Sequence, residues 1–198
     1  MGLFPINAEN WSEGVCLNGY VREMETYQED MQRRLEEVRL TGAELDQLSH
    51  VQRPIKIAAL SEDWCIDCLM TLPIMAQIAA AVPGIEMRIF SRSKWPSLKE
   101  FNNQRGVMAI PVYSFLDESF EEFGMFVERP KTAEIKLTAW KAAHPEVEEI
   151  RRSFSMPSSE KKALLASIRI DMQKEMEGWY AEECQNGMVA EVAAILGV

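Results

Sequence analysis

The sequence predicts an α/β protein in which helices cover both faces of a central mixed sheet of four strands, a three-layer α/β/α arrangement with helical extensions at both ends. Short apolar runs rich in β-branched residues alternate with helical segments in the middle of the chain, and both ends show helical periodicity without strands. The 198 residues are 47% hydrophobic, which is enough for a core without disulfide bonds. We divide the chain into an irregular arm and helical extension (1–50), an α/β domain (51–145) and a C-terminal helical extension (146–198) that packs on the domain.

Composition and charge argue against several classes of function. The formal net charge is −10, whereas proteins that bind nucleic acids or anionic membrane surfaces are usually basic. The sequence has no apolar run of about 18 residues, so it predicts no transmembrane helix. Its first residues lack the basic and apolar segments of a signal peptide. We therefore expect a cytoplasmic protein without nucleic-acid or membrane partners.

The first fifty residues predict an arm followed by helices. Residues 1–20 contain Gly, Pro, Asn and aromatic residues without periodicity, which indicates irregular structure. Apolar residues at steps of three or four predict a helix over 20–40. The Thr-Gly-Ala-Glu sequence at 41–44 is typical of a capping box and predicts a short second helix. We interpret this extension as packing scaffold, with a binding role as the alternative.

A strand, a helix and a second strand follow directly. Residues 54–60 form an apolar run with β-branched residues, which is typical of a buried strand. The segment 69–82 is almost wholly apolar, is one helix long and ends at the stop signal Pro83-Gly84. A second strand is predicted over 85–90. Because such a strand–helix–strand unit crosses over with a right-handed connection, the two strands should pair in parallel.

The rest of the domain completes the predicted sheet. A helix is expected over 95–103, where a proline stands near the first helical position, and a third strand over 111–116. The turn at 117–119 leads into 120–127, which alternates enough for an antiparallel fourth strand. A further helix over 130–143 should cover the sheet.

The C-terminal segment 157–198 is helical in pattern. Six of its apolar residues form one stripe at helical spacing: Leu164, Leu165, Ile168, Met172, Met176 and Trp179. Such a stripe either packs on the body of the protein or makes this helix a partner-binding one, and we favour packing.

Two of the four cysteines form the motif Cys65-Ile66-Asp67-Cys68. A single C-x-x-C motif is compatible with a redox pair or with half of a zinc site. Zinc needs two further ligands, and the remaining candidates are scattered along the chain: Cys16, Cys184, His50 and His144. We therefore favour a redox pair and no metal, keep zinc as the alternative, and interpret Cys16 and Cys184 as buried or incidental thiols.

The position of the pair between a strand and a helix predicts its chemistry. Cys65 should stand at the helix N-terminus, where unpaired backbone N–H groups and the helix dipole stabilise an anion such as a thiolate. Cys65 is thus the predicted nucleophile, exposed to solvent. Cys68 lies one turn later and should be more buried, and it can attack a mixed disulfide on Cys65 and release the reduced substrate.

The W-C-I-D-C segment at 64–68 resembles the W-C-x-x-C site of the thioredoxin superfamily. Pro73 stands where that family has a proline inside its active-site helix. Ile110-Pro111 stands where the family has a cis-proline just before a strand. The resemblance covers about residues 50–145, and it implies a thioredoxin-like fold for the domain.

The resemblance also implies roles for individual residues. Cys65 and Cys68 correspond to the catalytic cysteines of the family. Trp64 and the Ile110-Pro111 loop correspond to positions that lie beside the cysteines and contact the substrate. Trp64 could instead only shield the pair, and Ile110 could be packing at a strand edge.

The sequence departs from the family pattern beside the cysteines. In thioredoxins a buried acid, which helps to move protons, lies on the strand six residues before the first cysteine, where this chain has Ala59. Glu62 or Asp67 could take over this role through water. The charge of Asp67 should also disfavour a thiolate on Cys65. Glu62 and Asp67 are therefore candidates for tuning the pKa values of the pair.

The function that the resemblance implies is thiol–disulfide oxidoreduction in cell redox homeostasis, without a bound cofactor. Its substrates would be proteins or small compounds with disulfides. An external reductase or a low-molecular-weight thiol would supply electrons. The absent buried acid and the extra helices favour an alternative, a thioredoxin-fold redox sensor or binding module with little turnover.

Overall fold

The computed structural model describes residues 4–198, except for the side chain of Glu182. The chain divides into two compact units. The first contains Met1–Arg129 together with Met188–Val198, and the second contains Pro130–Gly187. The sheet belongs to the first unit, and the second is helical.

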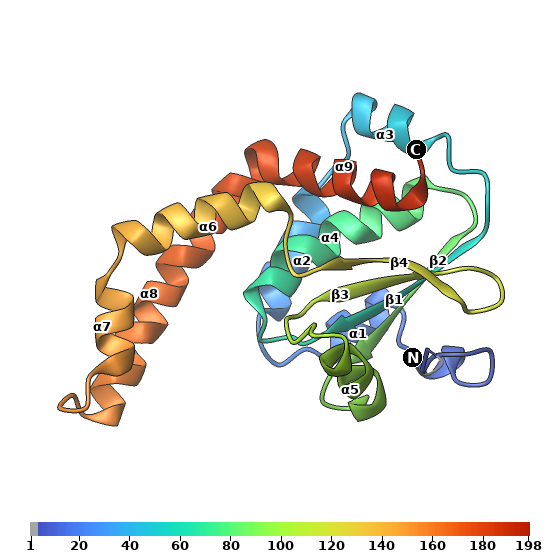
Figure 1. The fold of residues 1–198 in the computed structure, drawn as a ribbon. Coiled ribbons are helices and arrows are strands. Elements are labelled where there is room, and N and C mark those ends of the chain that lie inside the picture. Colours follow the sequence, from blue (N-terminus) through green and yellow to red (C-terminus); the bar gives the residue numbers. More distant parts are fainter. Residues whose placement is uncertain (1–3) are drawn as a thin grey trace. The chain divides into compact units, whose positions relative to one another are not determined.

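The first unit is built around a four-stranded sheet with the order β2-β1-β3-β4 (Figure 1). β1 (Ile55–Ser61) pairs in parallel with β2 (Ile85–Ser91) and in antiparallel with β3 (Val112–Leu116). β3 pairs in antiparallel with β4 (Glu122–Val127). The predicted mixed sheet, with its parallel first pair, is confirmed.

Helices cover both faces of this sheet. In Figure 1, α4 lies above the sheet with α2 and α3 near it, whereas α1 and α5 lie below. The part of α9 from Met188 onward belongs to the same unit. The helices have the following bounds: α1 Leu17–Glu23, α2 Gln28–Glu37, α3 Gly42–Leu48, α4 Ile66–Ala81, α5 Pro96–Gln104 and α9 Gln185–Leu196. The capping box that begins α3 is present as predicted.

Helix α4 lies in the core because its sequence is apolar on all sides. Every residue from Ile66 to Met75 is buried. Pro73 inside this helix has no N–H, so the carbonyl of Leu69 one turn earlier has no helical donor. Arg34 of α2, itself buried, fills this position: its Nε donates to the Leu69 carbonyl at 3.1 Å. The N-terminal extension therefore stabilises the helix that carries the cysteine pair.

The prediction of one helix over 20–40 is wrong, because α1 and α2 are separated by a turn. Tyr27 in this turn has a left-handed backbone with φ 56°. The carboxylate of Asp63 accepts hydrogen bonds from the backbone N–H groups of Glu25 at 2.7 Å and Thr26 at 3.0 Å. Asp63 thus binds amides that a continuous helix would satisfy internally. Apolar periodicity carries no information about such a contact.

The arm before α1 is anchored on the sheet, although it was predicted as irregular. A 3-10 turn, η1, spans Trp11–Glu13, and Val15 exchanges two backbone hydrogen bonds of 2.8 Å with Ile89 of β2. Gly14 lies so close to β2 that a Cβ there would stand 2.5 Å from the Phe90 ring and 2.8 Å from Cβ of Arg88. Glycine is therefore required at this position by close packing.

We expect Gly14→Ala to lower the free energy of unfolding by about 1–3 kcal/mol, because the added methyl group overpacks a well-packed site. Urea unfolding measures the effect. Gly42→Ala is the matched control, since a Cβ at Gly42 would meet nothing within 4 Å, and alanine there should leave stability unchanged or slightly higher. Equal unfolding midpoints for the two variants would contradict the close approach of the arm to β2.

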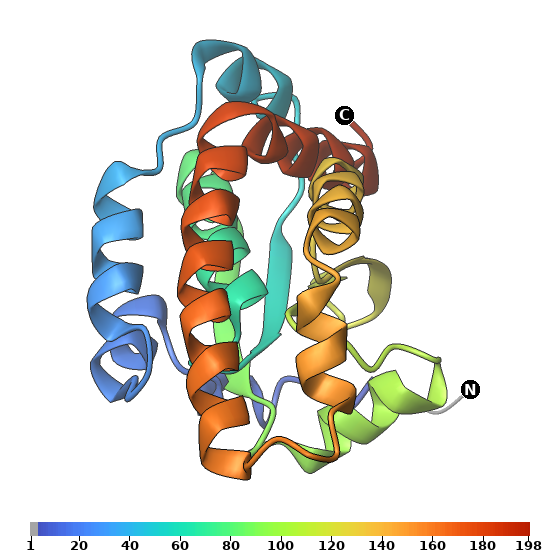
Figure 2. The ribbon, with the colours of Figure 1, turned by 90° about the vertical axis from the view of Figure 1, so that its left-hand side faces the viewer.

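The second unit is a helical hairpin (Figures 1 and 2). α6 (Lys131–Ala143) and α7 (Glu146–Arg152) form one arm, and α8 (Ser158–Trp179) forms the other. A π-helical turn over Tyr180–Cys184 then leads into α9. Within the helical extension predicted over 146–198, the sequence indicated neither α7 as a separate helix nor the π-helical turn.

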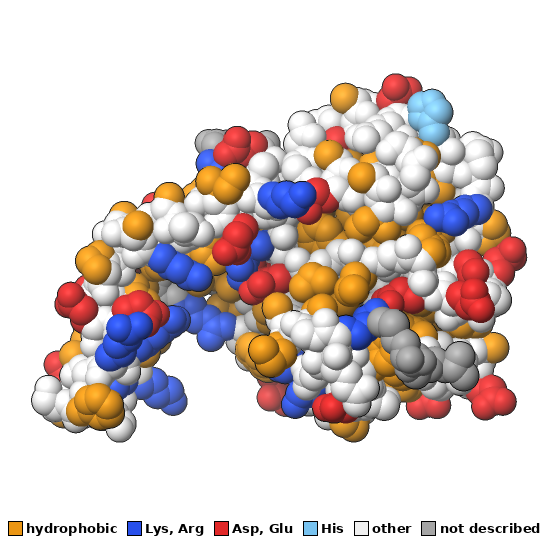
Figure 3. Space-filling view, viewed as in Figure 1, with side chains coloured by type: hydrophobic (Ala, Val, Ile, Leu, Met, Phe, Trp, Pro, Cys, Tyr) orange, Lys and Arg blue, Asp and Glu red, His pale blue; other side chains and the backbone are white. Residues whose placement is uncertain are grey.

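Apolar side chains hold the two arms of the hairpin together. Leu137, Trp140 and Val147 form its buried core, against which four residues of the predicted stripe pack: Leu165, Ile168, Met172 and Trp179. Figure 3 shows acidic side chains among the Lys and Arg side chains at the end of the hairpin, where Arg151 and Arg152 both pair with Glu148. None of the helices in residues 4–198 is both long and apolar enough to span a membrane.

Candidate functional site

The cysteine pair lies where β1 leads into α4 in the first unit. Cys65 is the N-cap residue of α4, with an extended backbone, and its Sγ accepts a hydrogen bond of 3.4 Å from the N–H of Cys68. This N–H is one of the donors that a helix leaves unpaired in its first turn. Both cysteines are free thiols. The predicted position of Cys65 at a helix N-terminus is confirmed.

The loop before β3 lies directly beside Cys65. The peptide bond between Ile110 and Pro111 is cis, as the resemblance implied. The thiol of Cys65 donates a hydrogen bond of 3.4 Å to the carbonyl of Ile110, which is 45 residues away in the sequence. The fold therefore brings together the cysteines and the loop that were predicted to form one site.

The exposure of the site differs from the prediction. Cys65 is only 8% exposed and Cys68 1% exposed, so the expected order is correct but Cys65 is not an open surface thiol. Both sulfurs belong to a buried apolar cluster that also contains Ile110. Trp64, by contrast, is 47% exposed. Trp64, directly before the pair in the sequence, is therefore far more open to solvent than either cysteine.

The two thiols have pKa values shifted in opposite directions. A hydrogen bond from the Cys68 thiol is the main cause that lowers the pKa of Cys65, and backbone N–H groups at Cys68 and Asp67 act in the same direction. Burial and the charge of Asp67 oppose this shift. Burial is the main cause that raises the pKa of Cys68 well above its usual value, followed by its interactions with Cys65. Cys65 is therefore the thiol that ionises first.

We expect alkylation of the reduced protein by iodoacetamide to distinguish the two thiols by pH. The rate at Cys65 should rise with a midpoint below that of an ordinary cysteine, because its pKa is lowered, and Cys68 should react only at distinctly higher pH. Peptide mass spectrometry at a series of pH values assigns each adduct. Exposed Cys16 provides an internal reference in the same sample. A lower pH midpoint for the alkylation of Cys68 than for that of Cys65 would contradict the geometry of the pair.

Asp67, between the two cysteines, is held by an ion pair that the sequence did not predict. The guanidinium of Arg129 binds both carboxylate oxygens of Asp67, with Nε at 2.9 Å and the terminal nitrogen at 2.7 Å. Both side chains are largely buried, at 9% exposed for Asp67 and 12% for Arg129. Arg129 follows β4, and the neighbouring Glu128 donates its N–H to the Pro111 carbonyl at 2.7 Å. Arg129 therefore offsets the charge of Asp67 beside Cys65.

Glu62 lies near the pair mainly through its backbone. Its carbonyl accepts the N–H of Cys65 at 3.2 Å, and its backbone N–H lowers the pKa of Cys68. Its carboxylate accepts a hydrogen bond of 2.5 Å from the N–H of Ser93. The predicted tuning by this carboxylate stays a prediction.

A hydroxyl group contacts the thiol of Cys68. Ser61, the last residue of β1, is fully buried, and its side chain hydrogen-bonds to the Cys68 thiol and lowers its pKa. The Oγ of Ser61 also lies 3.1 Å from the hydroxyl of Tyr20 in α1. Ala59, where the family has an acid, is buried as well. Nothing in the local sequence indicates that Tyr20 reaches this position from an extension outside the predicted domain.

The remaining cysteines and histidines lie elsewhere. Cys16 is the exposed N-cap residue of α1, and His50 is exposed after α3. In the second unit, Cys184 ends the π-helical turn, and the ring of His144 stacks on Trp140 at 4.2 Å between centroids. Within residues 4–198, apart from the side chain at 182, no three His, Cys, Asp or Glu side chains meet as metal ligands.

Comparisons with known proteins agree with this geometry. A family model described as Thioredoxin matches residues 14–141. A solved structure of a protein of unknown function from Pseudomonas aeruginosa is 21% identical, with a TM-score of 0.67, and the match covers 100% of this chain and 98% of that chain. An HIV epitope-scaffold is 22% identical, with a TM-score of 0.61 and 96% of each chain covered. No curated protein matches the sequence. The two structural matches show that the fold, extensions included, is shared over almost the full length.

Proposed function

The chain belongs to the thioredoxin family, and from this premise we propose that it is a thiol–disulfide oxidoreductase whose reactive pair is Cys65 and Cys68. The observation that carries the proposal is the position of Cys65 as the N-cap of α4. Its sulfur accepts a hydrogen bond from the N–H of Cys68 and lies within hydrogen-bond distance of the carbonyl of Ile110. A thiolate is stabilised there, and a second thiol stands one helical turn away.

The reaction proceeds through a mixed disulfide. The Cys65 thiolate attacks one sulfur of a substrate disulfide, the other substrate sulfur leaves as a thiolate, and the first stays bound to Cys65. Cys68 then attacks the Cys65 sulfur, releases the second substrate thiol and leaves a Cys65–Cys68 disulfide. An external reductase or a small thiol returns the pair to the dithiol form. The chemistry needs no bound cofactor.

Substrate access favours disulfides in extended or flexible segments. Because Cys65 is 8% exposed and lies in an apolar cluster, a substrate sulfur must approach closely among apolar side chains rather than meet a protruding thiol. We propose that the exposed Trp64 and the Ile110-Pro111 loop border this site and contact the substrate. A disulfide held inside a rigid core could not approach the sulfur this closely.

Turnover tests the proposal. With excess dithiothreitol and an insulin-type disulfide substrate, the wild-type protein should reduce many equivalents of substrate. A redox sensor, the second candidate, would become oxidised and reduced stoichiometrically but show a negligible catalytic rate. Cys16→Ser is the matched control, because it removes an exposed thiol outside the site and should retain full turnover. Stoichiometric reaction without turnover would favour the sensor.

A further inference from the structure

We propose that the buried hydroxyls of Ser61 and Tyr20 form a relay that carries the Cys68 proton to a polar pocket while Cys68 resolves the mixed disulfide. The inference rests on the proposed oxidoreductase function, and it identifies what replaces the acid that is absent at Ala59. Ser61 is the member of this relay that acts on Cys68, because a hydrogen bond from its side chain lowers the pKa of that thiol. Tyr20 acts through Ser61 and is a positioning residue.

The need for a relay follows from the burial of Cys68. Its sulfur must lose a proton before it can attack, yet the residue is 1% exposed and lies in an apolar cluster. In the resolving step, the electron pair of the Cys68 sulfur forms a bond to the Cys65 sulfur. The bond from Cys65 to the substrate breaks, and the substrate sulfur leaves with that electron pair. The proton from Cys68 must then reach water.

The two hydroxyls are placed to pass this proton on. The Ser61 side chain hydrogen-bonds to the Cys68 thiol, and its Oγ lies 3.1 Å from the Tyr20 hydroxyl. A hydroxyl donates one hydrogen bond and also accepts, so each group can take up a proton on one side as it releases its own on the other. Burial raises the pKa of Tyr20, which keeps its hydroxyl protonated and able to act in this way.

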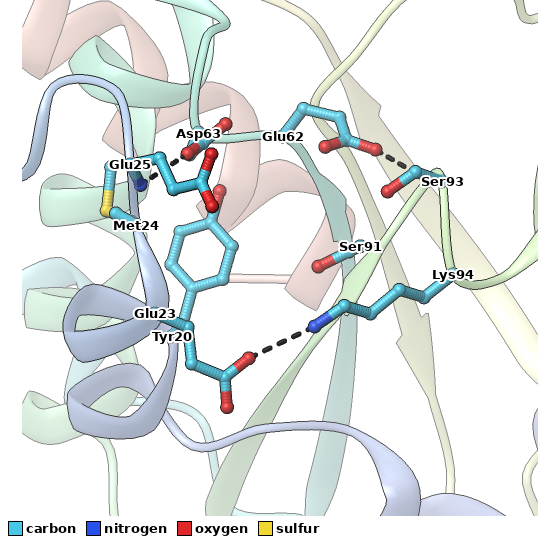
Figure 4. A pocket seen from close by; sticks show the side chains of 9 residues that line it. All are labelled: Tyr20, Glu23, Met24, Glu25, Glu62, Asp63, Ser91, Ser93 and Lys94. Carbon is cyan, nitrogen blue, oxygen red and sulfur yellow. Dashed lines mark hydrogen bonds and ion pairs between the residues drawn. The ribbon is translucent and has the colours of Figure 1, made fainter.

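Tyr20 connects this path to a pocket of about 270 Å³ in the first unit. Figure 4 shows the ring of Tyr20 extending from α1 towards the loop that carries Glu62 and Asp63. Water and carboxylates in such a pocket can accept a proton, whereas the apolar cluster around the two sulfurs cannot. The charged side chains that line the pocket are Glu23, Glu25, Glu62, Asp63 and Lys94.

Several of these charged side chains are already engaged with other groups. Lys94 pairs with Glu23 at 3.1 Å, and Asp63 already accepts the backbone N–H groups of Glu25 and Thr26. Glu62 also accepts one backbone N–H, from Ser93. We assign water in the pocket as the immediate acceptor of the proton leaving Tyr20, with the lining carboxylates, such as that of Glu25, as groups to which the water can pass it on.

The test follows the two thiol steps separately in the full chain. A Cys16→Ser parent removes the exposed thiol, and a dipyridyl disulfide is the probe. The first equivalent of thiopyridone reports attack by Cys65, and the second reports resolution by Cys68. Tyr20→Phe retains the ring and removes one hydroxyl. We expect its second phase to slow by about tenfold near neutral pH, less than the hundredfold or more that loss of a full acid–base group costs, because Ser61 remains.

Two further features distinguish a relay from a structural contact. The first phase should be unchanged in Tyr20→Phe, and the difference in the second phase should shrink as pH rises, because hydroxide then removes the proton directly. Ser61→Ala, which removes the contact with Cys68, should slow the second phase more. Tyr113→Phe is the matched control: it removes another buried phenol hydroxyl, 2.9 Å from Thr71 Oγ1, and should alter neither phase. Thermal melting verifies that each variant is folded.

The outcomes separate the relay from the function on which it rests. Equal slowing of both phases, or the same second-phase pH profile in Tyr20→Phe and Tyr113→Phe, would overturn the relay and leave the oxidoreductase assignment intact. Absence of the first phase in the parent protein would overturn the oxidoreductase assignment, and the relay with it.

Discussion

Cys65→Ser is expected to reduce disulfide-reducing turnover by roughly a thousandfold or more, to the uncatalysed rate, because a serine hydroxyl does not ionise near neutral pH and cannot replace the thiolate nucleophile. Cys68→Ser should also lose turnover, but for a different reason. Its Cys65 still attacks the substrate, and no second thiol resolves the product. The two variants therefore fail at different steps of one reaction.

Mass spectrometry of the intact protein distinguishes these two failures. With glutathione disulfide as substrate and a Cys16→Ser background, Cys68→Ser should accumulate one glutathione adduct on Cys65 that a small thiol removes. Cys65→Ser should accumulate little adduct, because Cys68 is buried and its pKa is raised. In cell extract, the same Cys68→Ser variant should retain protein substrates as mixed disulfides. Turnover at the wild-type rate in both variants would exclude the proposed mechanism.

Arg129→Met is expected to destabilise the protein and to weaken the nucleophile at the same time. The substitution leaves the carboxylate of Asp67 buried without its bidentate partner, and breaking a buried pair in this way costs about 3 kcal/mol or more. The charge of Asp67 raises the pKa of Cys65, and without Arg129 that charge is no longer offset. Less of Cys65 should then be thiolate near neutral pH.

Two measurements and two controls test the role of Arg129. Urea unfolding gives the stability, and the pH profile of Cys65 alkylation gives the direction of its pKa shift, which should be upward. In the double variant with Asp67→Asn, most of the stability and the low Cys65 pKa should return, because the buried charge at position 67 is removed and the second carboxylate that Arg129 binds, that of Glu128, is partly exposed to solvent. Arg33→Met removes an exposed arginine that pairs with Asp30 and Glu37, and it should cost less than about 1 kcal/mol. An unchanged alkylation profile in Arg129→Met would contradict charge compensation at the site.

The cysteine pair could be located from sequence because its placement depends on neighbouring residues. An apolar strand run, two cysteines three residues apart and an apolar helix ending at Pro83-Gly84 occur in one continuous segment. The direction of the chain alone then puts Cys65 at a helix N-terminus, and the structure has it there. The Ile110-Pro111 loop was identified through the family resemblance, and it lies beside Cys65 as expected.

The partners of the pair could not be found in this way, because they come from distant parts of the chain. Arg129 is 62 residues from Asp67, and Tyr20 is 41 residues from Ser61. No periodicity or spacing connects such positions. The same reason explains the wrong helix boundary near Tyr27, where the amides bind a carboxylate from another segment.

Local order along the chain was sufficient to predict the four-stranded sheet, the helix that follows the cysteines and the position of Cys65 at the N-terminus of that helix, since hydrogen bonding within strands, turns and helix ends depends on adjacent residues. The burial of Cys65, the neutralisation of Asp67 and the hydroxyls that reach Cys68 were decided by packing between segments. Charges and proton paths depend on distances through space, and those distances exist only once the chain is folded.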